Sequence, residues 1–265
     1  MVPDGLRHAI RLQDLPRANP ALDRVVARIK EVPEDFEVEE IPAYPPAGTG
    51  DHLFVRVQKR DMAGRDLILL MAEAAGVPPT EVGAAGMKDR RAVTRQWLSI
   101  PASGEANLLH ATLPDGVRIL ETARNDHKLR LGHLRGNRFR IVLRGVPADR
   151  LEALRQTAAI VSKDGFLNLF GEQRFGRDGR NLDTAFWLLG EGRRARLGGF
   201  QKRMAISALQ AALFNRYIEV RHGRGLGHQV LAGDVMAKAE TGGLFVAADV
   251  AVEQARLDQG ETRIT

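Results

Sequence analysis

Residues 86–97 read GMKDRRAVTRQW, and this stretch decides how the rest of the chain is interpreted. It contains a single carboxylate, Asp89, which stands between Lys88 and Arg90 after the small residues of 83–86. Flanking cations favour the ionised form of a carboxylate and attract phosphate groups. The stretch therefore suits an anionic nucleophile that acts on a phosphate-bearing substrate. A polar loop with a solvated ion pair is the other interpretation of the same residues.

The composition is that of a globular protein with a basic balance. The chain has 265 residues, of which 44% are hydrophobic and 27% charged, and its net charge is +6. A positive balance makes nucleic acid a partner worth testing. The absence of cysteine excludes disulfides, thiolate catalysis and cysteine-ligated metal centres. The first residues lack the layout of a secretory signal, and the longest apolar run, 67–72, is too short to span a membrane, so we expect a cytoplasmic protein.

Hydrophobic periodicity predicts both strands and helices along the chain. Strands are expected at 35–41, 53–57 and 96–100, and helices near the start and at 66–75, 148–161 and 202–220. The last helix carries a hydrophobic stripe that we expect to pack in a core: Ile206, Leu209, Leu213 and Tyr217, with Ala205, Ala208 and Ala212 beside it.

Residues 127–144 form the most basic part of the chain. Arginine and lysine alternate there with apolar residues on both sides of a glycine-containing loop at 132–136, which predicts two strands with one apolar and one cationic face. Such a face is either the solvated side of a sheet or a surface that contacts phosphates. Two further arginine clusters, at 177–180 and 193–196, allow the same two interpretations.

Several familiar catalytic motifs are absent from the sequence. It contains no GxxxxGK[ST] phosphate loop and no GxSxG nucleophile elbow, and its seven histidines show no HExxH or other ligand spacing. Carboxylates therefore remain as the candidates for catalysis, and Asp89 has the most suggestive surroundings of them.

At this point the motifs carry a resemblance to a known family. Residues 86–97 resemble the active-site motif of the TruD family of tRNA pseudouridine synthases. Further segments match the family in the same order: KEVPEDFEVEE at 30–40, GNRF at 136–139, NLFGEQRFG at 168–176, SALQAALFN at 207–215 and GDV at 233–235. The similarity spans roughly residues 28 to 265. Each segment alone is a weak signal, but five in sequence order are a strong one.

The resemblance implies an RNA-modifying isomerase. Enzymes of this family convert a uridine of tRNA, typically uridine 13, to pseudouridine by breaking the bond between ribose C1′ and the base N1 and rejoining the base through C5. The family uses no metal or organic cofactor, so we expect none here. The expected partner is tRNA, and we expect a monomer without membrane association.

The resemblance also assigns roles to individual residues. Asp89 matches the family's nucleophile, and Lys30 resembles the basic residue that forms an ion pair with it. Phe36 matches an aromatic residue near the target base, on which an unstacked uracil can stack, and Asn137 matches an asparagine that hydrogen-bonds the substrate. The other expected substrate-binding residues are Phe139, Lys88 and Arg90.

Plainer roles fit the same residues when the family is set aside. Lys30 would be a solvated lysine before a strand, Phe36 and Phe139 core residues, and Asn137 a turn residue. Lys88 and Arg90 would either steer phosphate or lie in solvent.

Contacts to the RNA are expected from the basic segment and from the 168–176 motif: Lys128, Arg130, Arg135, Arg138, Arg140, Gln173 and Arg174. A structural turn is the alternative for the last two. The chain departs from the family at Leu167 and Leu169, where proline and tyrosine are usual, and this departure concerns the local loop and not the family resemblance.

The implied fold is α+β. It consists of a mixed, mainly antiparallel sheet with helices, as in pseudouridine synthases, and an inserted α/β domain, the TRUD domain. We expect residues 1–164 to form the N-terminal portion of the catalytic domain and 165–265 the insertion domain. Family members continue past the position of Thr265 with a segment that returns to the catalytic sheet. The C-terminal part of the fold is therefore expected to be missing, and activity reduced or lost.

Two other functions remain open at this stage. One is a noncatalytic RNA-binding protein, or an inactive truncated family member, that keeps the basic surface. The other is a carboxylate-dependent hydrolase of a glycosidic bond. That enzyme would need a second acid opposite Asp89, and nothing in the sequence ties the glutamates at 37, 39 and 40 to it.

Overall fold

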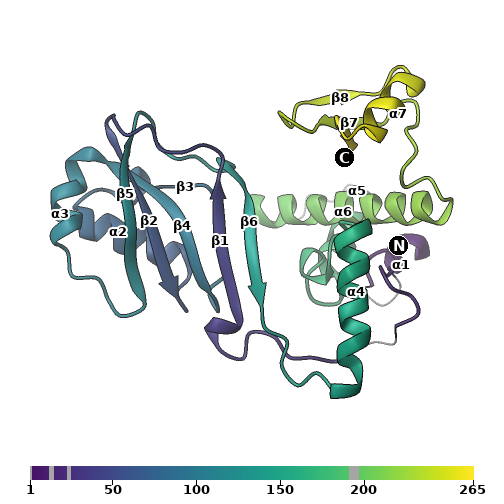
Figure 1. Ribbon diagram of the computed structural model, residues 1–265, viewed down its shortest axis with the longest axis horizontal. Coiled ribbons are helices and arrows are strands. Elements are labelled where there is room, and N and C mark those ends of the chain that lie inside the picture. The colour runs from purple at the N-terminus through teal and green to yellow at the C-terminus, as the bar shows by residue number, and fades with distance from the viewer. Residues whose placement is uncertain (1, 12–14, 23–24, 191–196) are drawn as a thin grey trace. The chain divides into compact units, whose positions relative to one another are not determined.

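The chain forms two compact units in the computed structural model, which describes residues 2–11, 15–22, 25–190 and 197–265. The sheet unit comprises Arg24–Leu151, and the helical unit comprises Met1–Asp23 together with Glu152–Thr265 (Figure 1). No helix among the described residues is both long and apolar enough to cross a membrane.

The sheet unit is built on six strands: β1 Phe36–Pro42, β2 His52–Arg60, β3 Gly83–Ala84, β4 Val93–Pro101, β5 Val117–Asn125 and β6 Leu134–Ile141. The strand order is β5-β2-β4-β1-β6, and β3 pairs with β4. Strands β1 and β4 run parallel, whereas the other pairs are antiparallel. The predicted mixed, mainly antiparallel sheet with helices is confirmed.

Helix α2, Gly64–Ala75, covers one face of this sheet together with the short helix α3, Glu105–His110 (Figure 1). Its residues Leu67 and Met71 are fully buried against inward-facing residues of β2 and β4. Burial of a side chain of this size contributes about 1.5–3 kcal/mol. The helix ends at Gly76, whose positive φ of 68° lets its N–H bond the carbonyls of the last turn, as the sequence predicted. This packing fixes the half of the sheet beside the candidate site.

The register places alternate residues of each strand on opposite faces. Lys59, Thr94, Val38 and Phe139 pair in one row across β2, β4, β1 and β6, on the face that α2 covers in part. We call this the site face. The opposite face carries an ion-pair ladder that runs from strand to strand: Arg140–Glu37, Glu37–Arg95, Arg95–Glu39, Glu39–Arg56 and Arg56–Glu121.

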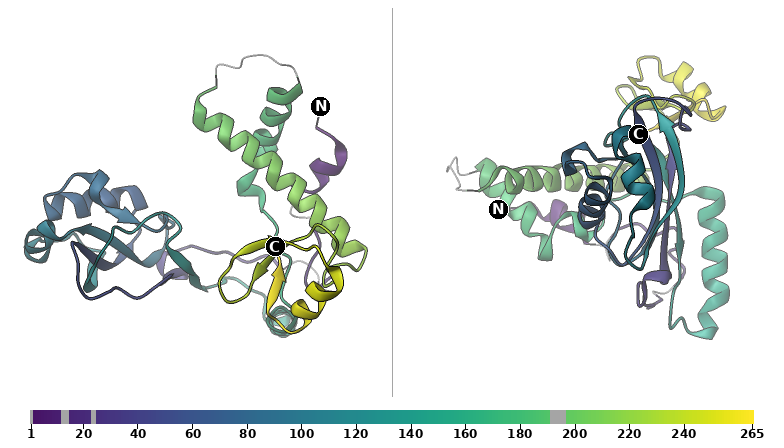
Figure 2. Two further views of the ribbon diagram at one scale, coloured as in Figure 1. Left: turned by 90° about the horizontal axis from the view of Figure 1, so that it is seen from above. Right: turned by 90° about the vertical axis from the view of Figure 1, so that its left-hand side faces the viewer.

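The helical unit contains α1 Asp4–His8, α4 Leu151–Asp164, α5 Arg180–Gly190, α6 Gly199–Gly223 and α7 Val250–Asp258. Helices α5 and α6 pack side by side (Figure 2). A small sheet follows, with the order β8-β7-β9, in which β7 is Val235–Lys238, β8 is Leu244–Val246 and β9 is Thr262–Ile264. Short 3₁₀ helices complete the chain at Pro33–Asp35, Pro79–Glu81, Ala102–Gly104, Ala148–Arg150, Glu172–Arg174 and Arg177–Gly179.

The predicted core stripe of α6 is confirmed only in part, because Leu209 packs against the buried cluster of the helical unit but Ile206 is 36% exposed. Leu213 is 52% exposed and Tyr217 is 46% exposed, whereas Ala205, Ala208 and the neighbouring alanines at 211 and 212 are buried. The short alanine side chains face α1 and α5, because small residues let helices approach closely while the larger side chains remain at the edge of the contact. The size of a side chain thus did not indicate which face of α6 is buried.

The basic segment 127–144 contains one strand rather than the two predicted. Residues 128–131 lie outside the sheet, and only β6 pairs with a neighbour. The N–H of Leu129 donates to Ser99 Oγ (2.9 Å) and that of Gly132 to the carbonyl of Ala85 (2.8 Å). These bonds hold the segment against β4 and the start of the Asp89 loop, but they do not form a ladder with a neighbouring strand.

The compact units do not coincide with the domain boundary expected from the sequence. Contacts group α4 and the N-terminal residues with the C-terminal part of the chain. The units describe packing alone, so the assignment of 1–164 to the catalytic domain and 165–265 to the insertion domain stays a prediction.

A buried carboxylate, Asp35, closes the segment that leads into β1. It is 1% exposed, and Arg144 donates to both of its oxygens, at 2.7 and 2.8 Å. The N–H groups of Glu31 and Val32 also donate to it, at 3.1 and 3.2 Å. The hydrogen bond from Arg144, more than any other contact, lowers the pKa of Asp35 to about 2.

Acid should therefore remove a stabilising contribution from this segment. Because the pKa of Asp35 in the folded protein is about 2 rather than 3.8, its contribution is complete above about pH 4 and is lost as the pH falls through 2. We expect Asp35→Asn to lower Tm at pH 7 and the difference from the parent to shrink between pH 4 and 2. Thermal unfolding monitored by circular dichroism measures this. The exposed Glu240→Gln variant should follow the parent at every pH, and a constant difference for Asp35→Asn would contradict the expectation.

Candidate active site

Asp89 lies in the loop between β3 and β4, with its side chain 48% exposed. Lys30 Nζ donates to its Oδ1 at 2.9 Å, although the two residues are 59 positions apart. The ion pair expected from the family resemblance is therefore formed. A carboxylate that is held by one cation and still open to solvent can receive a substrate.

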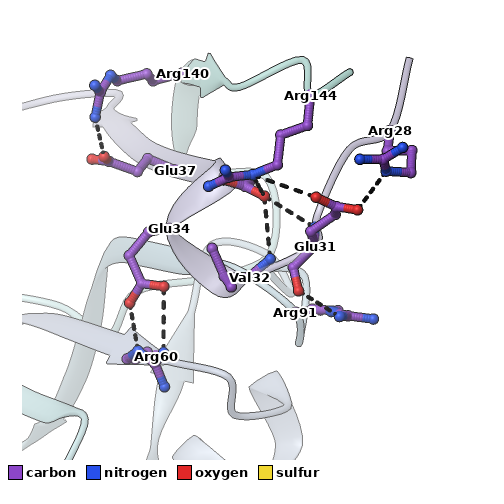
Figure 3. Close-up of polar contacts among 10 residues, drawn as sticks. Arg28, Glu31, Val32, Glu34, Glu37, Arg60, Arg91, Arg140 and Arg144 are labelled. Atoms are coloured by element: carbon purple, nitrogen blue, oxygen red, sulfur yellow. Dashed lines mark hydrogen bonds and ion pairs between the residues drawn. The ribbon is translucent and has the colours of Figure 1, made fainter. Parts of the chain in front are cut away.

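Lys30 adopts the left-handed backbone conformation, with φ of 57°. This is unfavourable for a residue with a side chain, so the surroundings must hold it. The next residue, Glu31, supplies that support: its carbonyl accepts from Arg91 at 2.7 Å, and its carboxylate accepts from Arg28 at 2.5 Å and lies 3.7 Å from Arg144 Nε (Figure 3). The contacts around Glu31 thereby fix the direction in which Lys30 points.

Two aromatic rings lie next to the ion pair. Lys30 Nζ is 3.8 Å from the centroid of the Phe36 ring, a cation–π contact. The rings of Phe36 and Phe139 meet edge to face, with centroids 5.8 Å apart. Phe36 is half-buried and Phe139 is 52% exposed, so Phe139 is not the core residue of the plainer interpretation. An exposed ring beside a carboxylate offers a stacking surface for a planar base.

Asn137 lies on β6 directly opposite Glu40 of β1, on the site face. Its Oδ1 is buried and has no hydrogen-bond partner among the described residues. A buried polar atom without a partner is unfavourable, so this amide is suited to bond a group that enters from outside. The residue stands inside a strand and not in the turn that the plainer interpretation gave it.

The structure shows Lys88 in a role that neither sequence interpretation gave it. Its ammonium is paired with Glu40 inside the sheet unit, where the two side chains are 5% and 1% exposed. The other oxygen of Glu40 accepts the N–H of Trp97 at 3.1 Å. Lys88 therefore anchors the Asp89 loop and does not present its charge to solvent. Arg90, two positions on, is exposed.

Lys59 is a residue at this site that the sequence analysis missed. It is fully buried at the end of β2, and its Nζ donates to the main-chain carbonyl of Asp89 at 2.7 Å. Burial lowers its pKa to about 8. The alternation of β2 carried a signal for it, because Leu53, Val55 and Val57 face the core and Lys59 follows in the same phase.

The basic residues predicted to contact RNA differ in how far their charge is available. Arg138 and Arg140 project from β6 on the face opposite to Phe139, as the alternation predicted. Arg140 is paired with Glu37 at 2.6 Å, and this hydrogen bond lowers the pKa of Glu37. Lys128 Nζ donates to the carbonyl of Thr80. Three residues are exposed and have no ion pair among the described part of the chain: Arg130, Arg135 and Arg138.

In the helical unit, Gln173 and Arg174 form part of the 3₁₀ helix Glu172–Arg174. Gln173 lines a pocket of about 560 Å³ together with Arg7, Arg11 and Arg177. Arg174 lies over the ring of Phe170, with Cζ 5.2 Å from its centroid. The cluster at 177–180 covers the turn into α5, whereas the cluster at 193–196 lies outside the described residues.

No three side chains of histidine, cysteine, aspartate or glutamate in the described ranges come together as a metal site would require. Asp89 and the neighbouring site face of β1 and β6 together present a carboxylate, amines, aromatic rings and one amide. This set can provide a nucleophile, an ion-pair partner, a stacking surface and a hydrogen-bonding group.

Comparison with known proteins points to one family. The model of the family described as tRNA pseudouridine synthase D (TruD) matches residues 21–183. The tRNA pseudouridine synthase D of Anaeromyxobacter sp. (strain Fw109-5) is 44% identical over 255 residues, which cover 94% of this chain and 72% of that protein. The protein of the same name from Thermus thermophilus is 40% identical over 243 residues, which cover 92% of this chain and 66% of that protein. The crystal structure of a putative tRNA pseudouridine synthase D from Methanosarcina mazei has the same fold, with a TM-score of 0.75 at 21% identity over 99% of this chain and 77% of that chain.

The buried ion pair allows a stability test. Replacing one member leaves the other charge desolvated, so we expect Lys88→Met to lower the free energy of unfolding by about 3–5 kcal/mol. The double variant with Glu40→Gln should recover most of this loss, because the amide removes the charge and can still accept from Trp97. Urea unfolding measures both variants.

A matched control is the exposed pair of Arg155 with Glu152, whose nitrogen and oxygen are 3.5 Å apart. Breaking it with Arg155→Met should cost less than about 1 kcal/mol. Equal losses for Lys88→Met and Arg155→Met would show that the buried pair is not the anchor described here.

Proposed function

The chain belongs to the TruD family of tRNA pseudouridine synthases, and we propose that Asp89 is the nucleophile with which it converts uridine 13 of tRNA to pseudouridine. The conversion of uridine to pseudouridine in tRNA is the function of the chain as a member of this family. The observation that carries the residue assignment is the half-exposed carboxylate of Asp89, held by Lys30 at 2.9 Å.

The reaction makes defined demands on the site. The uridine has to leave its stack before its C1′ and C6 atoms can be reached. The C1′–N1 bond then breaks, the base turns, C5 bonds to C1′, and the proton of C5 is lost while N1 gains one. Attack on C1′, addition to C6 and a glycal route all require an ionised carboxylate beside the sugar and base. The ion pair with Lys30 supplies this carboxylate in a fixed direction.

The neighbouring residues supply the remaining contacts of the proposal. The exposed ring of Phe139, set edge to face against Phe36, offers a surface on which the flipped uracil stacks. The unpartnered Oδ1 of Asn137 offers a hydrogen bond to the substrate. Arg90 is exposed next to Asp89 and is positioned to attract a phosphate. Lys88 supports the loop from within and makes no contact of this kind.

The proposal also covers the contacts to tRNA, the division of the chain into domains, and the state and place in which the protein acts. Phosphates of the tRNA are contacted by Arg130, Arg135 and Arg138, and in the helical unit by Gln173 and Arg174. Residues 1–164 serve as the catalytic domain and 165–265 as the insertion domain. The protein acts as a monomer in the cytoplasm, and the reaction uses no cofactor.

Asp89→Asn tests the catalytic assignment. The amide keeps the size of the side chain and removes its charge, so we expect pseudouridine formation to fall by at least about 10³-fold while tRNA affinity changes less than about twofold. Carbodiimide treatment and primer extension of tRNA incubated with each variant locate the modified uridine. Asp115→Asn, at an exposed position before β5, should behave as the parent. If parent and variant bind tRNA equally and neither forms pseudouridine, the chain is a noncatalytic RNA-binding protein.

The salt dependence of tRNA binding tests the proposed phosphate contacts. Each phosphate neutralised contributes roughly 0.7–0.9 to the slope of log affinity against log salt concentration. We expect Arg138→Gln to lower the slope by about that amount. Arg140→Gln should lower it less, because Glu37 already balances the charge of Arg140. Filter binding over a range of salt concentrations measures both, and identical slopes in all three proteins would count against β6 as a phosphate-contacting strand.

A further inference from the structure

We infer that Lys59 is a positioning residue that fixes the main chain at Asp89 from beneath the loop and thereby sets where the carboxylate stands. The inference rests on the proposed role of Asp89 and adds a residue that does not touch the substrate. Lys59 acts on Asp89 through the carbonyl of that residue.

The geometry of Lys59 has no other evident use. The residue is fully buried at the last inward position of β2, and its ammonium donates to the Asp89 carbonyl at 2.7 Å. The cross-strand neighbours of Lys59 are Thr94 and Val117, which are uncharged. The main chain of Asp89 is thus the acceptor of the one hydrogen bond that is observed for this buried cation.

Two buried lysines hold adjacent positions of the same loop. Lys59 holds the carbonyl of Asp89, while Lys88 reaches from the loop to Glu40 inside the sheet unit. Between them they fix the backbone on either side of the Asp89 Cα. Its side chain is left 48% exposed and meets Lys30. This arrangement separates the anchoring of the loop from the chemistry of the carboxylate.

Burial of the Lys59 ammonium is unfavourable for folding. Desolvation lowers its pKa to about 8 from the ordinary 10.5, which means that burying the charged ammonium on folding costs free energy. A methionine of similar length would fill the same space without that cost. A purely structural role therefore predicts that Lys59→Met leaves the loop as ordered as before, whereas a positioning role predicts a looser loop in a protein that is no less stable.

The charged groups that act on Lys59 are few. Among the described residues they are Asp89 and Lys88 on the loop and Asp61 after the end of β2. The side chains that precede Lys59 on the same face of β2, Leu53, Val55 and Val57, pack with apolar residues of α2. The cost of burying the charge is present below about pH 8 and is relieved as the pH rises from 8 to 10.5. Over the same range the charge-assisted hydrogen bond becomes a weaker neutral one. As the pH rises over this range, the protein should become more stable while the hydrogen bond that holds the loop becomes weaker.

The experiment compares the full chain with Lys59→Met, Lys59→Arg and a control, Lys163→Met, which replaces an exposed lysine of α4. Amide hydrogen exchange of residues 86–92 reports the loop, and thermal unfolding reports stability. For pseudouridine formation, kcat and KM are measured from about pH 6.5 to about pH 9.5, a range that brackets the lowered pKa of Lys59. Hydrogen exchange needs no turnover, so a failure of this inference can be told apart from a failure of the proposed function.

We expect Lys59→Met at pH 7 to exchange the loop amides about tenfold faster, to lower kcat about tenfold with KM within about twofold, and to keep the Tm of the parent. The parent should lose kcat above about pH 8, and Lys59→Arg, which stays charged, should lose less of it. Lys163→Met should match the parent. Unchanged loop exchange in Lys59→Met overturns the inference, even if the parent shows no turnover. A fall in kcat of Lys59→Met that is accompanied by a lower Tm than that of the parent overturns it as well, because general destabilisation would then explain the loss.

Discussion

The buried ion pair between Lys88 and Glu40 is the interaction on which the candidate site depends. Its side chains are 5% and 1% exposed, and Glu40 is held in turn by the N–H of Trp97 on β4. Two desolvated charges are stable only while they stay in contact, so the loop cannot shift without a large cost. Asp89 follows Lys88 directly in the chain, so the ion pair of Lys88 also fixes the main chain of Asp89. The proposed catalytic carboxylate is therefore placed by a residue that the substrate never meets.

A second constraint acts from the other side of the carboxylate. Lys30 reaches Asp89 from a left-handed backbone conformation, which the ion pairs around Glu31 and the buried Asp35 stabilise. The segment before β1 and the loop before β4 each have contacts of their own, the hydrogen bond from Arg91 to the Glu31 carbonyl links them, and the parallel pairing of the two strands brings them together. The ion pair between Lys30 and Asp89 therefore joins two segments that other contacts already hold beside each other. Such preorganisation is what a reaction on a flipped nucleotide requires.

Some arginines of the sheet are paired with glutamates and stabilise it, whereas others, without an ion pair in the described part of the chain, are left free to contact RNA. Acids and arginines alternate across the face opposite the site and satisfy one another, as Glu37 does with Arg95 and Arg140. An arginine inside such a ladder, such as Arg140, has little attraction left for a phosphate, whereas Arg138 on the same strand has no ion pair among the described residues and keeps its own. Counting basic residues in the sequence therefore overstates the surface available to RNA. The basic character of 127–144 is real, but part of it serves the sheet.

The sequence by itself determined the elements with strong periodicity and the identity of the chemistry. Alternation located β1 and β2, a helical pattern ending at Gly76 located α2, and matching motifs identified the family and singled out Asp89, because these signals are local. Tertiary structure alone decided which polar residues are buried. Lys88 appears in the sequence as an ordinary loop charge, and for Lys59 the alternation of β2 indicates only the face; the packing of β1, β2 and β4 around the loop shows both ammonium groups inside. The physical reason is that desolvation and ion pairing depend on neighbours brought together from distant parts of the chain.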